Sequence, residues 1–155
     1  MEGKKNSYRW ATVKNSLPYA AIVTLSVYKN AANRNEIFEK YSGHGFTSQG
    51  SIESVILQGF DSWKTAAKHG LEYAFSLVDT FWNVDLEKIE GRAFLDTNPS
   101  IVGYTVMRAF FDKINYQLDS DQIAILEEFV FRSWTKPYKE LIPNFFNLTF
   151  TEYSV

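Results

Sequence analysis

Apolar and polar positions follow two different periods along the chain, and each period predicts a different kind of element. Near the start, residues 8–13 and 19–28 are rich in β-branched and aromatic side chains, which is typical of strands. Pro18 directly precedes the second run, at a position where a strand can begin. Residues 29–35 are polar and predict a loop. The first third of the chain is therefore expected to hold at least two strands.

The next segment, residues 36–46, fits two elements. Ile37, Phe38 and Tyr41 share one face of a short helix that Gly43 would cap, and the same run also fits an edge strand. We favour the strand.

The strongest periodicity lies in residues 52–78, where apolar residues recur at spacings of three and four. This spacing predicts one long amphipathic helix, with Ser51 as its N-cap directly after Gly50. Gly59 and Gly70 fall on the apolar stripe, although a glycine inside a helix costs about 1 kcal/mol relative to alanine. We therefore expect both glycines to mark points of close approach to a neighbouring strand or helix.

The following segment predicts an extended run and then a second helix. Residues 84–96 look extended, with a one-residue slip in the apolar alternation that fits a bulge near Lys88. Asn98 and Pro99 then supply a capping side chain and a proline in the first turn. Helical spacing continues from this cap to about Tyr116.

The last part of the chain completes an α+β pattern. An acidic cap at residues 119–121 predicts a third helix that ends before Pro137, and residues 146–150 alternate as a last strand that closes the sheet. We therefore expect a β-β-(β)-α-β-α core with helices on one face of a mixed sheet, plus a third helix and a C-terminal strand. No linker or repeat interrupts residues 1–155, which predicts a single domain with residues 1–7 as a flexible arm.

Composition narrows the chemistry that is open to this chain. The 155 residues include no cysteine and two histidines, with a net charge of −2 and a pI of about 5.7. The lack of cysteine excludes disulfides, thiol nucleophiles, iron–sulfur clusters and cysteine-ligated zinc. Mild acidity is unlike the footprint of a strongly basic nucleic-acid-binding domain. Residues 1–14 differ from the rest, since they carry four basic residues and one acidic residue.

The sequence indicates neither a membrane protein nor a metalloprotein. The start of the chain is polar, and the longest mostly apolar run, residues 17–27, is shorter than the roughly 20 residues of a membrane span. We therefore expect a cytoplasmic protein without membrane contact. A metal site would require His44 and His69 to converge with a carboxylate, and we expect no metal and no cofactor.

Part of the chain, residues 19–116, resembles a known family. The matching features are the block 51–60, the pair Gly70-Leu71, the strand 82–86 followed by Gly91, and a second helix after Asp96. These features resemble domain IV of elongation factor G and the matching domain of the tetracycline-resistance ribosomal protection proteins. The resemblance implies a ribosomal protein S5 domain 2-like fold, a β-β-β-α-β-α unit, and a preference for RNA or ribosome surfaces. This chain has no Walker loop, and residues 91–96 lack the histidine that elongation factor G tends to carry there.

One glycine-rich stretch is a candidate ligand site. It contains Gly43, His44, Gly45 and Ser51, which would place backbone N–H groups at the N-terminus of the long predicted helix. Such N–H groups bind phosphate or carboxylate, and His44 would serve as a donor or general acid near neutral pH. The same glycines also fit an ordinary turn.

A basic surface is the second candidate site. Lys64 and Lys68 share one face of the long predicted helix, and Arg92 and Arg108 are expected near it. With a tryptophan alongside, these residues would contact phosphates of RNA or an acidic partner. The same residues also fit an ordinary solvated helix face.

Two functions therefore remain open. We favour a non-catalytic binding module that contacts a protein or an RNA–protein surface through a sheet edge or through Lys64 and Lys68. The alternative is a small-molecule enzyme or ligand sensor that uses the Gly43-His44-Gly45 loop. The β-prone C-terminal run would, if exposed, also allow pairing with a second copy, so a homo-oligomer remains open.

Overall fold

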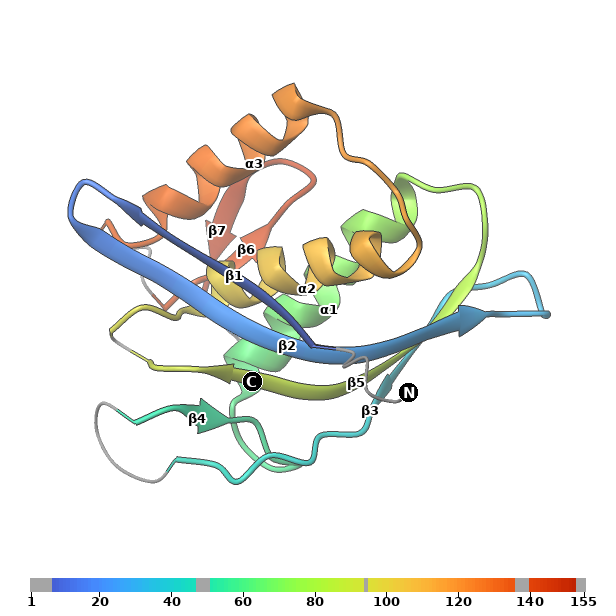
Figure 1. The fold of residues 1–155 in the computed structure, drawn as a ribbon, viewed down its shortest axis with the longest axis horizontal. Helices are drawn as coiled ribbons and strands as arrows, with labels where there is room; N and C mark the ends of the chain where they lie inside the picture. The colour runs from blue at the N-terminus through green and yellow to red at the C-terminus, as the bar shows by residue number, and fades with distance from the viewer. Residues whose placement is uncertain (1–6, 47–50, 94, 136–139, 153–155) are drawn as a thin grey trace.

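A computed structural model describes residues 7–46, 51–93, 95–135 and 140–152. The expected flexible arm, residues 1–7, lies outside this part except for Ser7, for which the prediction is wrong because Ser7 is paired in the first strand. Five strands form one mixed sheet in the order β1-β2-β5-β3, with β4 also paired to β5 (Figure 1). Their bounds are β1 Ser7–Lys14, β2 Leu17–Lys29, β3 Glu36–Glu39, β4 Glu53–Ser54 and β5 Trp82–Gly91. The neighbours are antiparallel except β3, which runs parallel to β5.

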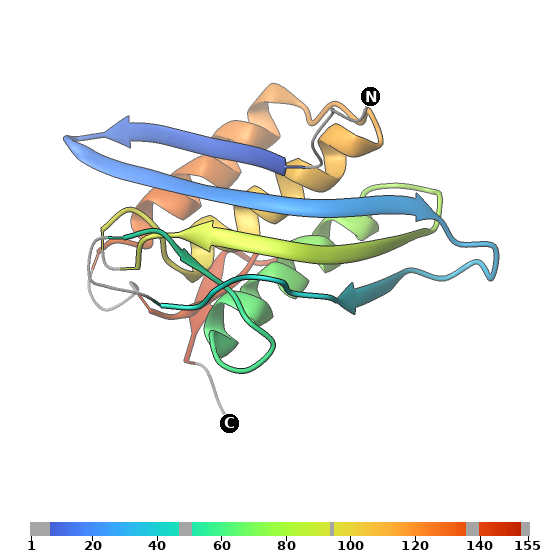
Figure 2. The same cartoon turned by 60° about the horizontal axis from the view of Figure 1, so that its bottom comes forward.

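Three helices lie on the same side of this sheet, as the α+β prediction requires (Figures 1 and 2). They are α1 Asp61–Ser76, α2 Pro99–Lys113 and α3 Ser120–Arg132. None of these helices combines the length and apolarity needed to cross a membrane, within the part of the chain that is described.

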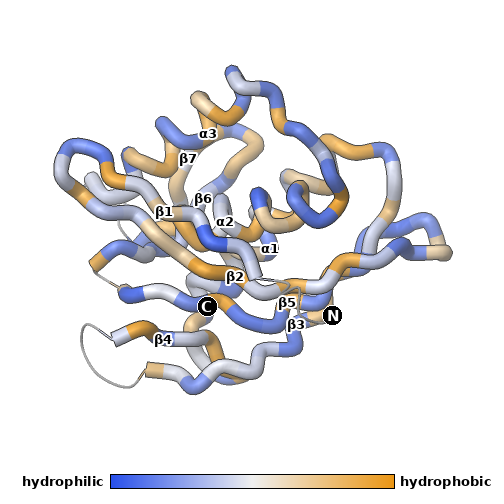
Figure 3. Tube along the Cα trace, in the orientation of Figure 1, coloured by the Kyte–Doolittle hydropathy of each residue, from blue (hydrophilic) through white to orange (hydrophobic). Residues whose placement is uncertain are grey.

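The core lies between the sheet and the helices, and strand alternation selects the side chains that enter it. Ala21, Val23 and Leu25 of β2 are buried, and so are Val84 and Leu86 on the adjacent β5. The middle of β2 is apolar, whereas the segment that leads from β2 to β3 is largely hydrophilic (Figure 3). The predicted strands at the start of the chain are thus confirmed.

The predicted bulge is also confirmed. Thr24 pairs with Lys88, while the next residue of β2, Leu25, pairs with Leu86, so Glu87 is the extra residue. The extra residue shifts the side-chain phase, which lets both Leu86 and Ile89 point into the core.

The predicted start of the long helix, at Ser51, is wrong. The chain extends at Glu53–Ser54 to pair with β5, and α1 begins only at Asp61. Gly59 and Phe60 hold positive φ angles of 94° and 57°, which a continuous right-handed helix does not allow. Ser51 therefore does not cap α1, and Gly59 is an exposed loop residue rather than a packing point. The apolar spacing before Gly59 arises from residues that flank β4 and not from a helix.

The second predicted packing point is confirmed. A Cβ added at Gly70 of α1 would lie 2.1 Å from the carbonyl oxygen of Gly103 of α2. The absence of a side chain at both positions therefore lets the two helices cross in close contact.

The later helix caps follow the sequence prediction. The Asn98 side chain accepts a hydrogen bond from the N–H of Ile101 (3.0 Å), and Pro99 occupies the first turn of α2. The Asp119 side chain accepts from the N–H of Asp121 (3.2 Å) at the start of α3. Both caps satisfy backbone donors that a helix end leaves unpaired.

The prediction that the C-terminal tail closes the main sheet is wrong. β7 Thr149–Thr151 pairs with β6 Ile142–Asn144 in a separate two-stranded sheet. Phe145 of this hairpin is buried against Phe129 of α3, so the tail packs on helices. The segment 36–46, in turn, is extended, with β3 at an edge of the main sheet, so the helical alternative for it is wrong.

Candidate functional site

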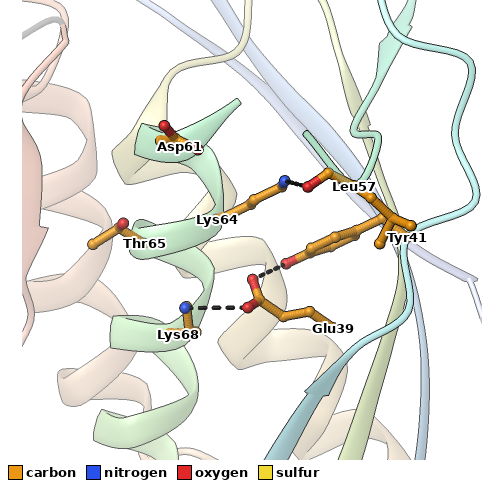
Figure 4. Close-up of a pocket in the computed structure, with 7 residues that line it drawn as sticks. All are labelled: Glu39, Tyr41, Leu57, Asp61, Lys64, Thr65 and Lys68. Carbon is orange, nitrogen blue, oxygen red and sulfur yellow. Dashed lines mark hydrogen bonds and ion pairs between the residues drawn. The ribbon is translucent and has the colours of Figure 1, made fainter. Parts of the chain in front are cut away.

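A hollow with a volume of about 370 Å³ lies between α1 and the segment that follows β3 (Figure 4). It is lined by Glu39, Tyr41, Leu57, Asp61, Lys64, Thr65 and Lys68. Asp61, Lys64 and Lys68 are spaced by three and four residues, which puts them on one face of α1. We call this hollow the lysine pocket.

Lys64 is the most unusual residue of the lysine pocket, since it is only 9% exposed. Its ammonium donates a hydrogen bond to the carbonyl of Leu57 (2.7 Å) and lies 5.2 Å from the centroid of the Tyr41 ring. A carbonyl dipole and the negative face of an aromatic ring both stabilise a cation. Among the described residues, no carboxylate forms an ion pair with Lys64.

On the other side of the lysine pocket, three side chains are connected by hydrogen bonds. The Tyr41 hydroxyl donates to Glu39 Oε2 (3.2 Å), and Lys68 Nζ donates to Glu39 Oε1 (3.2 Å). Burial raises the pKa of Tyr41, and the Glu39 charge and hydrogen bond raise it further. The phenol therefore stays neutral and acts as a hydrogen-bond donor at physiological pH.

The sequence pattern singles out Lys64 and Lys68 but predicts that they lie on an open helix face. The structure covers that face with the extended segment that carries Glu39 and Tyr41. Glu39 and Tyr41 are two residues apart, which puts both side chains on one side of an extended chain. Together with the strand predicted for residues 36–46, this spacing is the sequence signal that could have identified the pair.

The structure does not bring Arg92 and Arg108 to the two lysines. Arg92 bonds to Asp96 and lines a separate hollow of about 90 Å³ near the end of β5. Arg108 of α2 donates to the Tyr104 hydroxyl (2.8 Å) and lies 3.5 Å from Glu127 of α3. The four basic residues therefore line three different hollows.

The glycine-rich loop uses its backbone donors within the fold. The N–H of Gly43 donates to Val55 O (3.1 Å), that of His44 to Ser54 Oγ (2.7 Å), and that of Gly45 to Ser54 O (2.7 Å). The His44 residue itself is exposed. The sequence predicted that this loop and Ser51 lie at the N-terminus of the long helix. That prediction is wrong, because α1 begins only at Asp61.

The two histidines lie on different elements. The His69 ring on α1 donates through Nδ1 to the carbonyl of Pro143 (2.9 Å), which ties the C-terminal hairpin to the helix. The described residues contain no group of three or more histidine, aspartate or glutamate side chains that would hold a metal ion.

Strand β1 is a free edge of the main sheet (Figure 2). Asn15 and Ser16 form a two-residue turn with φ angles of 52° and 66°, and Lys14 pairs with Leu17 across it. Such a turn closes on a hydrogen-bonded pair, and bonded pairs alternate with unbonded pairs along the ladder. The backbone groups that point away from β2 are consequently those of Ser7, Arg9, Ala11 and Val13.

Ala20 of β2 supports this assignment. It lies opposite Ala11, yet its N–H donates to Asp96 O (2.7 Å) and its C=O accepts from Thr97 Oγ1 (2.6 Å). Within the described ranges, no hydrogen bond reaches the outer backbone groups of β1. β1 also has no proline and no bulge, two devices that protect edge strands. Its outer edge is therefore open to pairing.

Comparison with known proteins gives no further guide. No protein-family model matches the chain, and no curated protein matches it.

Proposed function

We propose that this chain is a non-catalytic binding module that takes an extended segment of a protein partner as an additional strand beside β1. The observation that carries the proposal is the open backbone edge of an eight-residue strand. Strand addition uses such an edge, because main-chain hydrogen bonds provide affinity and alternate side chains provide specificity.

The charge of this edge favours an acidic partner segment. Arg9 and Lys14 are exposed on β1, which contains no acidic residue. A second copy of β1 would bring the same positive charges to the edge, and like charges in a strand pair are unfavourable. A partner strand with aspartate or glutamate would instead complement Arg9 and Lys14.

RNA is a weaker candidate for the partner. Lys64, Lys68, Arg92 and Arg108 line separate hollows, and Lys64 is buried, so they do not form one surface along a phosphate backbone. Protein–RNA affinity depends strongly on such basic surfaces.

The proposed relationship to the elongation factor G domain IV-like fold, of ribosomal protein S5 domain 2-like type, rests on element order. When the two-residue strand β4 is left out, the first six elements are β-β-β-α-β-α. This relationship favours a ribosome-associated protein as the partner of the β1 edge.

Ala11→Pro tests strand addition at β1. The N–H of Ala11 points outward, so proline there removes a donor for the added strand without removing a β1–β2 hydrogen bond. Ala11→Thr is the matched control, because it keeps the N–H and suits a strand. Thermal melts check that both variants fold like the wild type.

The functional measurement is affinity capture from the lysate of the native host, with and without nuclease, followed by mass spectrometry. We expect a nuclease-resistant protein that the wild type and Ala11→Thr capture and that Ala11→Pro loses. Capture that survives in folded Ala11→Pro contradicts strand addition. A partner that disappears after nuclease treatment supports an RNA surface instead.

The alternative function, a ligand sensor built on the Gly43-His44-Gly45 loop, has less support. The three backbone N–H groups that would bind an anion are occupied by Val55 and Ser54.

A further inference from the structure

Lys64 is a buried cation whose hydrogen-bonding capacity is only partly used. An ammonium group has three donors, and the structure assigns one of them to the Leu57 carbonyl. Burial of a charge is unfavourable unless the charge is paired and fully hydrogen-bonded. Among the described residues, Lys64 has no carboxylate partner, and its buried positive charge is stabilised by a carbonyl dipole and an aromatic ring rather than by an opposite charge.

The opposite charge is also available in the lysine pocket. Asp61, in the first turn of α1, lines the hollow and has no ion-pair partner within the described part of the chain. Glu39, by contrast, is bonded to Tyr41 and Lys68, so these charges compensate one another. Thr65 of α1 also lines the hollow, and its side chain points away from the Lys64 ammonium (Figure 4).

From this arrangement we propose that the lysine pocket binds a small zwitterion of the free amino acid class. The ligand carboxylate pairs with Lys64, and the ligand ammonium pairs with Asp61. This site is separate from β1, since β3 and β1 lie at opposite edges of the main sheet. The proposal of zwitterion binding can therefore be tested independently of strand addition.

The size and charge of the lysine pocket limit the ligand. A volume of about 370 Å³ lies at the lower end of the range of roughly 300–1,000 Å³ that is typical of small-molecule sites. The carboxylate of Asp61, unpaired among the described residues, lines the same hollow as Lys64, so a multiply charged anion such as phosphate meets repulsion there. A molecule with one positive and one negative group avoids that repulsion.

The first experiment compares probes on the wild-type protein. NMR titration with glycine and the larger L-amino acids should shift resonances of residues that line the lysine pocket. Acetate and methylamine each keep one charge of glycine, and each should bind at least about tenfold more weakly, because one charged hydrogen bond is lost. Inorganic phosphate should not bind at this site.

The second experiment repeats the best amino acid titration on three variants. Asp61→Asn and Lys64→Met should each weaken binding about tenfold or more, because each removes one charged partner. Glu72→Gln, the matched control, removes one negative charge from an exposed position elsewhere on α1 and should leave binding unchanged. Asp61 is exposed, so Asp61→Asn remains informative if Lys64→Met does not fold.

Three results would overturn the proposal. The first is that no amino acid shifts the lysine pocket resonances of the wild type at millimolar concentration. The second is that acetate or phosphate binds as tightly as the best amino acid. The third is that folded Asp61→Asn keeps wild-type affinity.

Discussion

The crossing of α1 and α2 allows a stability prediction that can be worked out from distances. In Gly70→Ala, the new Cβ would lie 2.1 Å from the carbonyl oxygen of Gly103, whereas ordinary contact begins at 3.4 Å. The two atoms must therefore move apart by about 1.3 Å. The obstacle is helix backbone rather than a flexible side chain, so the helices themselves must shift.

The expected net cost of Gly70→Ala is about 2 kcal/mol of unfolding free energy. Overpacking in a core costs about 1–3 kcal/mol, and an obstacle made of backbone places this substitution near the upper end. The higher helix propensity of alanine offsets about 1 kcal/mol of this cost. For a chain of this size, the net change corresponds to a Tm lower by roughly 4–8 °C.

Urea unfolding followed by circular dichroism measures this cost. Glu72→Ala is the control, because it changes an exposed residue of the same helix and should stay within about 0.5 kcal/mol of the wild type. A Gly70→Ala variant as stable as the wild type would refute the close crossing of α1 and α2.

Two further predictions concern buried polar groups near the end of β5. Thr97→Val removes a hydroxyl that donates to Ala20 O (2.6 Å) and accepts from Arg92 N–H (2.9 Å). Urea unfolding should therefore show an unfolding free energy lower by about 2 kcal/mol. An unchanged free energy of unfolding would contradict these hydrogen bonds. Burial raises the pKa of Glu53 above its ordinary value of 4.5, although a hydrogen bond from Ala93 N–H lowers it. The stabilising contribution of protonated Glu53 is therefore complete below pH 4.5 and is lost as the pH rises through the folded pKa. Glu53→Gln should raise stability at neutral pH and flatten this part of the stability–pH profile, and an unchanged profile would contradict the shift.

Local signals predicted the first two strands and the last two helices well. The asparagine–proline pair at residues 98–99 and the acidic cap at residue 119 act within one helical turn, so the sequence alone contains the information. The bulge beside Lys88 was predictable for the same reason, because the apolar phase changes within a single strand.

The apolar periodicity predicted the wrong element where strand and loop segments carry apolar residues at the spacing of a helix. Residues 52–60 have apolar side chains at helix-like intervals, but Val55 is buried directly after β4 and Leu57 is exposed in a loop. The left-handed backbone at Gly59 and Phe60 ends this segment, and a residue other than glycine seldom adopts it without tertiary support.

The candidate sites were only partly predictable. Lys64 and Lys68 were singled out from the sequence, but Glu39, Tyr41 and Asp61 were not. These residues come together because β3 runs parallel to β5 and the segment after β3 passes over α1, a pairing between distant parts of the chain. No local pattern encodes which edge of a sheet a short strand will join.

The sequence by itself determined the α+β class, the first two strands and the caps of the last two helices, since each depends on neighbouring residues and on local backbone preferences. Only the tertiary structure decided that β1 remains an open edge, that the C-terminal hairpin packs on helices, and that Lys64 is buried without a carboxylate partner among the described residues. These outcomes depend on long-range burial and strand pairing, where apolar area removed from water outweighs local preference.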